Sequence, residues 1–163
     1  MGKVTDTWTR EGKQFMKTLR ELAELEVRIG YQREQGPGVD TDDDGRPRAD
    51  LVDIALWNEF GVESNNVPSR PFMRDSVDKH IAAIDHALMA QKDALLKGAT
   101  AKSVLNDLGL FQRDLIQTEM KEGDFVANAD STIEKKKSAK PLIDKGHLKD
   151  LVQYQIVKKG SMD

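Results

Sequence analysis

Residues 25–31 read Leu-Glu-Val-Arg-Ile-Gly-Tyr. Because of this short segment, the predicted fold contains strands as well as helices. The apolar side chains of the segment alternate with charged residues and a glycine, a period of two that is typical of a strand with one buried and one wet face. In the preceding segment, Thr9–Leu22, apolar residues recur at steps of three and four, which indicates an amphipathic helix. The change of period predicts a helix that leads directly into a strand.

A second alternating segment near the C-terminus supplies a partner for this strand. Val152, Tyr154 and Ile156 alternate with polar residues. This pattern predicts that the last structured piece, Leu148–Val157, is a strand that returns to pair near Leu25–Tyr31.

A short helix is predicted over Ala49–Phe60, where apolar residues share one side. Asp50 is of the residue type that accepts hydrogen bonds from the first turn of a helix. Gly61 is the expected stop, because the residue after a helix often adopts a positive φ that glycine tolerates best. An irregular linker, Val62–Pro68, should follow.

Two long helices are predicted in the middle of the chain. Ser69 is the expected cap of the first, with Pro71 in its first turn, and apolar residues recur at helical spacing up to Lys97. Such a helix would be about 40 Å long at 1.5 Å per residue. The second spans Thr100–Gly123, with Gly109 as a weak point in it. The predicted fold class is therefore α+β, a small antiparallel sheet packed against two long helices and one short helix.

The length of 163 residues suits a single domain, residues 1–163. Polar composition and turn residues predict a mobile loop at 35–48, an extended loop at 124–140 and a flexible tail at 158–163.

Composition excludes several classes of protein. The chain has 25 Lys and Arg against 28 Asp and Glu, a net charge of -3, which disfavours general nucleic-acid binding. It has no cysteine, so disulfides, thiolate catalysis and Cys-ligated zinc are excluded. No apolar run approaches the roughly 20 residues of a membrane span, and a reducing cytosol is the expected site of synthesis. The hydrophobic share of 38% is lean and fits a protein that completes its core by oligomerising.

The segment Asp40–Gly45 imitates the opening of a calcium-binding loop, with aspartates at positions one, three and five and glycine at six. The twelfth position, which needs a bidentate carboxylate, is Leu51, and Arg46 and Arg48 would repel a cation. A solvated acidic connector is favoured. A cytosolic calcium-binding regulatory module that uses this loop remains the alternative from another functional class.

No catalytic, cofactor or metal site is predicted. His80 and His86 lie six apart, whereas two metal ligands on one helix face need a spacing of three or four. The lysine run Lys135–Lys137 could touch phosphate, but no aromatic residues are interleaved to stack on bases. A small enzyme or nucleic-acid factor is therefore a weaker third interpretation, and a solvated loop is favoured.

The segment around residue 70 predicts a stiff corner between helices. Trp57 and Phe60 are expected to pack, and Pro68 and Pro71 should stiffen the bend. Arg70, held between these prolines, is expected to bind a carboxylate or the carbonyls that end the preceding helix. Such a fixed corner suits packing and subunit contact better than catalysis.

Two segments resemble small tail-component proteins of tailed bacteriophages. Ile54–Gly61 followed by Val67–Arg74 is similar to an apolar helix ending in Glu-Phe-Gly and a Pro-x-Arg-Pro-Phe corner. Ser131–Lys137 followed by Lys140–Leu148 is similar to the Thr-Ile-x-x-Lys and Lys-Pro-Leu-x-Asp-Thr-Gly-x-Leu stretches of the same proteins. The resemblance covers about Ala49 to Val157, in the same order.

The resemblance implies a non-enzymatic virion protein that is assembled in the bacterial cytoplasm. It implies a neck or tail-completion protein that joins the head connector to the tail as a ring, usually six-fold, through whose lumen DNA passes without sequence-specific contacts. Its implied partners are itself, the head connector and the tail-tube or tail-terminator proteins, with no membrane. A tail terminator or other minor tail protein is the alternative within the same class.

The residues of these motifs are expected to fix the fold for assembly rather than to perform chemistry. The expected structural residues are Trp57, Glu59, Phe60, Gly61, Pro68, Arg70, Pro71, Phe72, Pro141, Leu142, Gly146 and Leu148.

Overall fold

The computed structural model describes residues 7–31, 39–41, 47–128, 134, 141–142 and 147–161. The elements in chain order are α1 (Arg10–Glu24), β1 (Leu25–Gly30), β2 (Val39–Thr41), β3 (Pro47–Asp50), α2 (Leu51–Phe60), the 3-10 turn η2 (Glu63–Asn65), α3 (Phe72–Asp78), α4 (Ile81–Leu96), α5 (Ala101–Glu122), α7 (His147–Asp150) and β4 (Gln153–Lys158).

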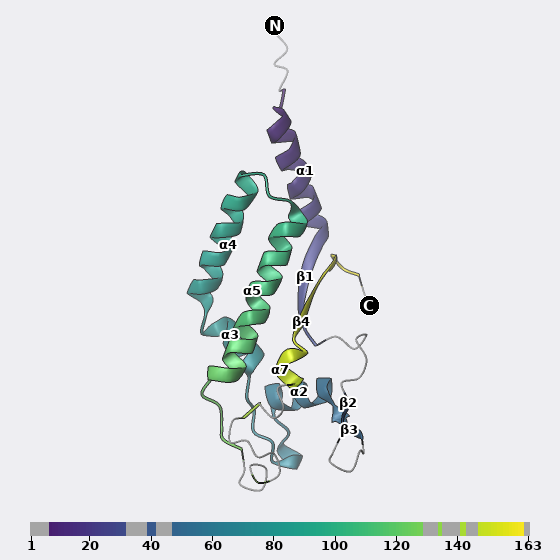
Figure 1. Cartoon of the computed structure of the whole chain (residues 1–163), viewed down its shortest axis with the longest axis vertical. Helices are drawn as coiled ribbons and strands as arrows, with labels where there is room; N and C mark the ends of the chain where they lie inside the picture. Colours follow the sequence, from purple (N-terminus) through teal and green to yellow (C-terminus); the bar gives the residue numbers. More distant parts are fainter. Residues whose placement is uncertain are drawn as a thin grey trace.

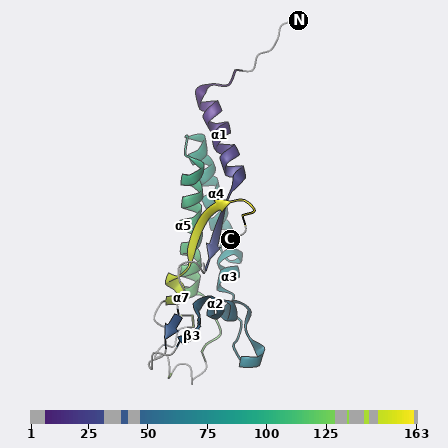
Figure 2. The same cartoon turned by 90° about the vertical axis from the view of Figure 1, so that its right-hand side faces the viewer.

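The molecule is an elongated α+β fold, as predicted. Helices α4 and α5 form an antiparallel hairpin, and α1 projects beyond the end of this hairpin (Figure 1). The ribbon of β1 and β4 lies against α5, as the second view shows (Figure 2). A second antiparallel pair, β2 and β3, precedes α2. None of the helices in the described ranges combines the length and apolar character needed to cross a bilayer.

The first and last predicted strands pair as expected. β1 and β4 are antiparallel, with Leu25 opposite Lys158 and Gly30 opposite Gln153. The predicted start of the last strand was wrong, because the short helix α7 precedes β4. The predicted start of the tail was also wrong. Lys158 belongs to β4, and the next residue donates a backbone hydrogen bond to the Glu24 carbonyl at 2.8 Å.

The predicted loop 35–48 also differs from the structure, since β2 and the start of β3 lie inside it. The backbone pairing of these two strands places Val39 opposite Asp50. Residues 32–38 and 42–46 lie outside the described residues, so the predicted mobility of the loop stays a prediction.

The core lies at one end of the molecule, where α2, α3, α7 and the second half of α5 meet. Phe72 and Val152 are fully buried. The remaining buried members of this cluster are Leu51, Ala55, Ile116, Met120, Leu142 and Leu148. By contrast, α4 contributes no buried residue. Outside this cluster, the buried apolar residues of the described ranges are Ala101 and Val104 at the start of α5.

The helix predicted between residue 69 and Lys97 is two helices, which is a correction. α3 ends at Asp78 and α4 begins at Ile81, and neither proline nor glycine stands at the break. The break coincides with a tertiary contact, because Lys79 and His80 both contact the carboxylate of Glu119 on α5. Adjacent side chains on a continuous helix point about 100° apart, so the interruption brings both more easily to one carboxylate.

Gly109 was predicted only as a weak point of its helix, but it is also where the sheet contacts α5. It is buried in the middle of α5, and a Cβ atom there would lie 2.7 Å from Cγ of Tyr154 on β4. The Tyr154 hydroxyl donates to Oδ1 of Asn106 at 2.6 Å, which fixes the ring over the glycine. The missing side chain therefore lets the sheet pack closely on α5.

We expect Gly109→Ala to destabilise the protein by about 2 kcal/mol, because overpacking a fixed contact outweighs the gain of about 1 kcal/mol in helix propensity. The matched control is Gly12→Ala in α1, where the nearest atom is Cε3 of the exposed Trp8 at 3.1 Å, an atom that can move. Chemical denaturation should show a loss for the first variant and no loss for the second. Equal effects would contradict the role given to Tyr154.

Candidate functional site

The candidate site is the corner, defined as residues 56–74, where α2 ends and α3 begins. Gly61 has φ +77, and a Cβ atom there would lie 2.9 Å from the backbone nitrogen of Ser69. The chain then forms a narrow loop closed by an isolated bridge between Val62 and Val67, with Asn66 in the left-handed region at φ 52. The predicted stop at Gly61 is confirmed, and the loop returns the chain to the end of α2.

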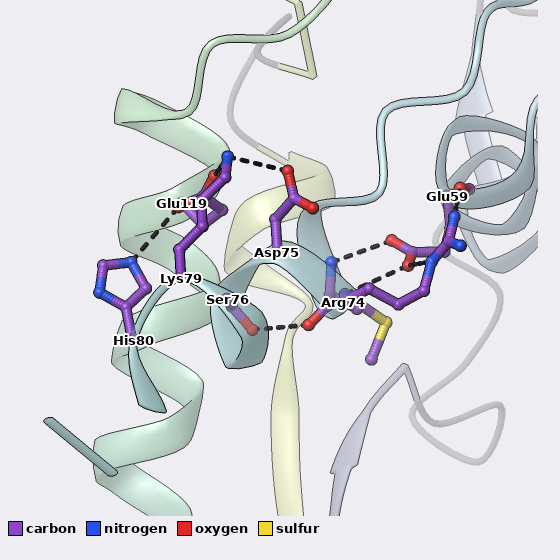
Figure 3. A network of polar contacts seen from close by, with 8 residues as sticks. Glu59, Arg74, Asp75, Ser76, Lys79, His80 and Glu119 are labelled. Atoms are coloured by element: carbon purple, nitrogen blue, oxygen red, sulfur yellow. Dashed lines mark hydrogen bonds and ion pairs between the residues drawn. The ribbon is translucent and has the colours of Figure 1, made fainter. Parts of the chain in front are cut away.

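Glu59 caps the helix that follows the corner. Its side chain is 5% exposed, and its carboxylate accepts hydrogen bonds from the backbone N–H of Met73 at 2.9 Å and of Arg74 at 3.2 Å (Figure 3). These donors are among those that a helix start leaves without intrahelical partners. The prediction that Ser69 caps this helix was wrong, since its hydroxyl donates to the Glu59 carbonyl.

Arg74 binds Glu59 from the solvent side. Its Nε lies 3.1 Å from a Glu59 carboxylate oxygen, and Nη2 donates to the Glu59 carbonyl at 3.0 Å. The guanidinium lies 5.6 Å from the centre of the Phe60 ring. Phe60 is nonetheless 67% exposed and Trp57 40% exposed, so the expectation that both pack inside was wrong. Their face of α2 is directed away from the core that Leu51 and Ala55 enter.

Arg70 joins the corner to the segment after α5. It is 6% exposed, and burial lowers the pKa of its guanidinium. Nη1 donates to Oδ1 of Asn58 at 2.9 Å, and Nε donates to the Val126 carbonyl at 2.8 Å. Nη2 donates to the Ala127 carbonyl and to Oδ1 of Asn128. The sequence predicted that Arg70 binds the carbonyls that end the preceding helix. The carbonyls that its guanidinium binds belong instead to the distant residues 126–127, and its contact with α2 is the amide oxygen of Asn58.

A second buried carboxylate holds the other end of α3. Glu119 on α5 is 5% exposed, and its oxygens lie 2.7 Å from Nζ of Lys79 and 3.4 Å from Nε2 of His80. Lys79 also lies 2.8 Å from Asp75. The hydrogen bonds to Asp75 and Glu119 raise the pKa of Lys79 above its ordinary value.

A buried serine lies between these two ends of α3. The Ser76 hydroxyl donates to the Met73 carbonyl at 2.7 Å and accepts from Gln112 of α5 at 3.3 Å. Figure 3 shows both carboxylates directed at α3, one from α2 and one from α5. The chemical effect of the arrangement is to fix α3 at both ends, since the carboxylates bind donors that α3 and the break after it supply.

The second motif reaches the same core. Leu142 is 6% exposed with φ 61, an unusual conformation for a bulky residue. Leu148 of α7 is 7% exposed, and both belong to the cluster that contains Phe72. Pro141 is half-buried. Gly146 lies outside the described residues.

The other sequence candidates are only partly visible. Leu51, at the twelfth position of the calcium-like pattern, begins α2 and is buried in the core. Residues 42–46, which complete that pattern, lie outside the described residues, and so does the lysine run Lys135–Lys137. Within the described ranges no three His, Asp or Glu side chains gather as a metal site would require.

A groove of about 980 Å³ lies at the opposite end of the molecule from the core. It is formed by the first half of α1, including Phe15, and by residues 95–99 at the turn from α4 to α5. None of the predicted motif residues lines it. The corner is thus a packed joint and not part of this groove.

Tyr31 connects the corner to the sheet and gives a pH-dependent prediction. Its ring meets Phe72 edge-on at 6.4 Å, and its hydroxyl lies 3.9 Å from Sδ of Met120. Burial, and secondly the nearby charge of Glu59, raise the pKa of Tyr31 above its ordinary value of 10.0.

A raised pKa in the folded state means that this tyrosine stabilises the fold fully below pH 10, and that the contribution is lost progressively at higher pH. We expect Tyr31→Phe to flatten the fall in melting temperature above pH 10. Tyr154→Phe is the control, and thermal melts at pH 8 to 11 are the measurement. An identical alkaline slope in wild type and Tyr31→Phe would contradict this account.

Comparison of the chain with protein-family models, curated proteins and solved structures finds no match.

Sequence reasoning missed several residues that organise the site. The sequence assigns no role to Glu119, Lys79 or Ser76, nor to Asn58 or Asn128. Glu59 was named within the motif without its role as a cap. The one local signal for Glu59 is its position among apolar residues at the end of a helix, in Trp-Asn-Glu-Phe. A charged residue there is buried only when it has polar partners.

Proposed function

We propose that this protein is a non-enzymatic structural protein of a tailed-phage virion, a neck or tail-completion protein that joins the head connector to the tail. The observation that carries the proposal is the meeting of the two segments that resemble phage tail components. Phe72 of the first and Leu142 and Leu148 of the second share one core, although 70 residues separate Phe72 from Leu142. Motifs that occur together in order, and also pack together, behave as one structural unit.

The surface of the corner supports an assembly role. Three apolar side chains of α2 are exposed there, Leu56 at 47%, Trp57 at 40% and Phe60 at 67%. Val126, whose carbonyl binds Arg70, is 59% exposed. Clustered apolar side chains on a rigid surface are typical of subunit contacts, and aromatic residues are enriched in such contacts.

The buried polar contacts give this surface a fixed shape. Glu59 fixes the start of α3, and Arg70 ties the corner to residues 126–128. A surface that is already ordered loses less conformational entropy when a neighbour binds. In a closed ring each subunit needs two different complementary faces, and we assign the corner to one of them.

Solution mass and negative-stain images test the proposal. The expected result is a closed ring, either for the protein alone or after mixing with the head-connector and tail-tube proteins of the same phage. Binding to the connector would favour a neck protein, whereas binding only to the last ring of the tube would favour a tail terminator. No ring and no binding to either partner would refute the proposal.

We expect Trp57→Ser to abolish or strongly reduce ring assembly while the melting temperature changes little, because this side chain contributes surface and little core. Trp8→Ser is the matched control, since Trp8 is 52% exposed on the far side of the molecule, before α1. Size-exclusion chromatography with light scattering compares the two. Assembly that survives Trp57→Ser unchanged would remove the corner from the ring interface.

A further inference from the structure

Helix α4 carries an exposed row that the proposed function does not use. Its apolar members are Ile81, Leu88, Met89 and Leu96, which are 57%, 48%, 55% and 67% exposed. Asp85 and Lys92 are exposed in the same row. At 100° per residue, these six side chains fall within an arc of about 100° on the helix. The row is therefore a continuous apolar stripe with one acid and one base in it.

The order of residues in this stripe is symmetric about its centre. Ile81 and Leu96 are equally far from the midpoint between Leu88 and Met89. Asp85 and Lys92 are equally far from the same midpoint, on opposite sides of it. Two copies of the helix laid antiparallel would therefore match apolar with apolar and acid with base at every level of the stripe.

We propose that α4 binds α4 of a second copy of this chain, antiparallel and related by a two-fold axis at the midpoint between Leu88 and Met89. Asp85 of each copy then faces the partner's Lys92, which gives two symmetric ion pairs. Leu88 and Met89 lie beside their own counterparts at the centre, and Ile81 lies level with the partner's Leu96. A two-fold contact of this kind uses one self-complementary face.

The charge pattern selects this occupant and this direction. A parallel arrangement of two α4 helices in register would place Asp85 beside Asp85 and Lys92 beside Lys92, which is repulsive. The interior side of α4 is already used, because Ile84, Ala87 and Leu95 are partly buried there. The proposal does not rest on the phage assignment, since a ring needs two different faces and this face binds itself.

Charge exchange tests the proposal on the intact protein. In Asp85→Lys both cross-pairs become Lys beside Lys, and in Lys92→Asp both become Asp beside Asp. We expect each single variant to dimerise about tenfold more weakly than wild type, since two exposed pairs change from attraction to repulsion. An equimolar mixture of the two variants restores both pairs, so it should form a heterodimer, and the double variant should dimerise like wild type.

Sedimentation across a concentration series measures these affinities, with thermal melts to verify that each variant is folded. Leu88→Gln gives a second test without charge and is expected to leave a monomer at concentrations where wild type is dimeric. Rescue by the mixture would establish the antiparallel pairing. A wild-type mass that shows no two-fold association, or single variants that associate like wild type, would overturn it, whether or not a ring forms.

Discussion

Arg70→Ala is expected to lower the free energy of unfolding by about 3 kcal/mol, one of the two largest losses for a single change in this protein. The substitution removes one buried guanidinium and its hydrogen bonds to Asn58, Val126, Ala127 and Asn128. It also weakens the attachment of the corner to the segment after α5, because three of these bonds reach residues 126–128. Chemical denaturation measures the loss.

Two comparisons make this prediction specific. Arg70→Lys keeps the charge but loses the planar fork that reaches α2 and residues 126–128 together, so it should recover less than half of the loss. Arg20→Ala is the matched control, because Arg20 is exposed on α1. It should cost about 0.5 kcal/mol or less. An Arg70→Ala protein as stable as Arg20→Ala would contradict the proposed role.

Glu59→Ala is expected to cost about 3 to 4 kcal/mol, because it removes a buried carboxylate that receives two backbone N–H groups and the Arg74 guanidinium. The start of α3 would lose its cap, and Phe72, fully buried in the first turn, would lose its fixed position. We expect the loss to appear as a lower denaturation midpoint and faster amide exchange in residues 72–78.

Glu59→Gln tests more specifically whether both carboxylate oxygens are needed as acceptors. One oxygen can still accept, but the amide nitrogen would face a backbone donor, so most of the loss should remain. Glu63→Ala is the control, since Glu63 is exposed on the loop and its side chain forms no hydrogen bond or ion pair with the described residues. If Glu59→Gln were as stable as wild type, one acceptor would suffice, and the two-donor cap would not be the reason for burying this residue.

The two predictions concern one mechanism. Glu59 and Glu119 reach α3 from different helices, and Arg70 reaches residues 126–128 from the corner. Removing either corner residue should therefore loosen the surface formed by Leu56, Trp57 and Phe60. Assembly defects in Arg70→Ala and Glu59→Ala should follow their stability losses, whereas Trp57→Ser should affect assembly alone. This difference separates the role of the scaffold from the role of the contact surface.

Local signals in the sequence determined where several elements begin or end. The change of period at Leu25 predicted the passage from α1 to β1, and Asp50 was correctly predicted as the cap of α2. Gly61 ends α2 with a positive φ, as glycine at this position suggests. The alternation in Val152–Ile156 was sufficient to predict the pairing of β1 with β4. The helix ends, the caps and the alternation within each strand depend on residues a few positions apart, so the sequence contains them. The pairing of β1 with β4 was predicted by matching two such alternating segments near the two ends of the chain.

The tertiary structure alone decided which side chains meet across long separations. No proline or glycine marks the break at Lys79 and His80, and both residues contact Glu119, about 40 positions later. The cap of α3 comes from the preceding helix, across a loop whose geometry the periodicity of side chains does not encode. Gly109 matters because Tyr154 packs on it. Such contacts form only when segments distant in the sequence have packed together. The sequence alone could therefore identify Glu59 and Arg70 as structural residues but not the groups that they bind.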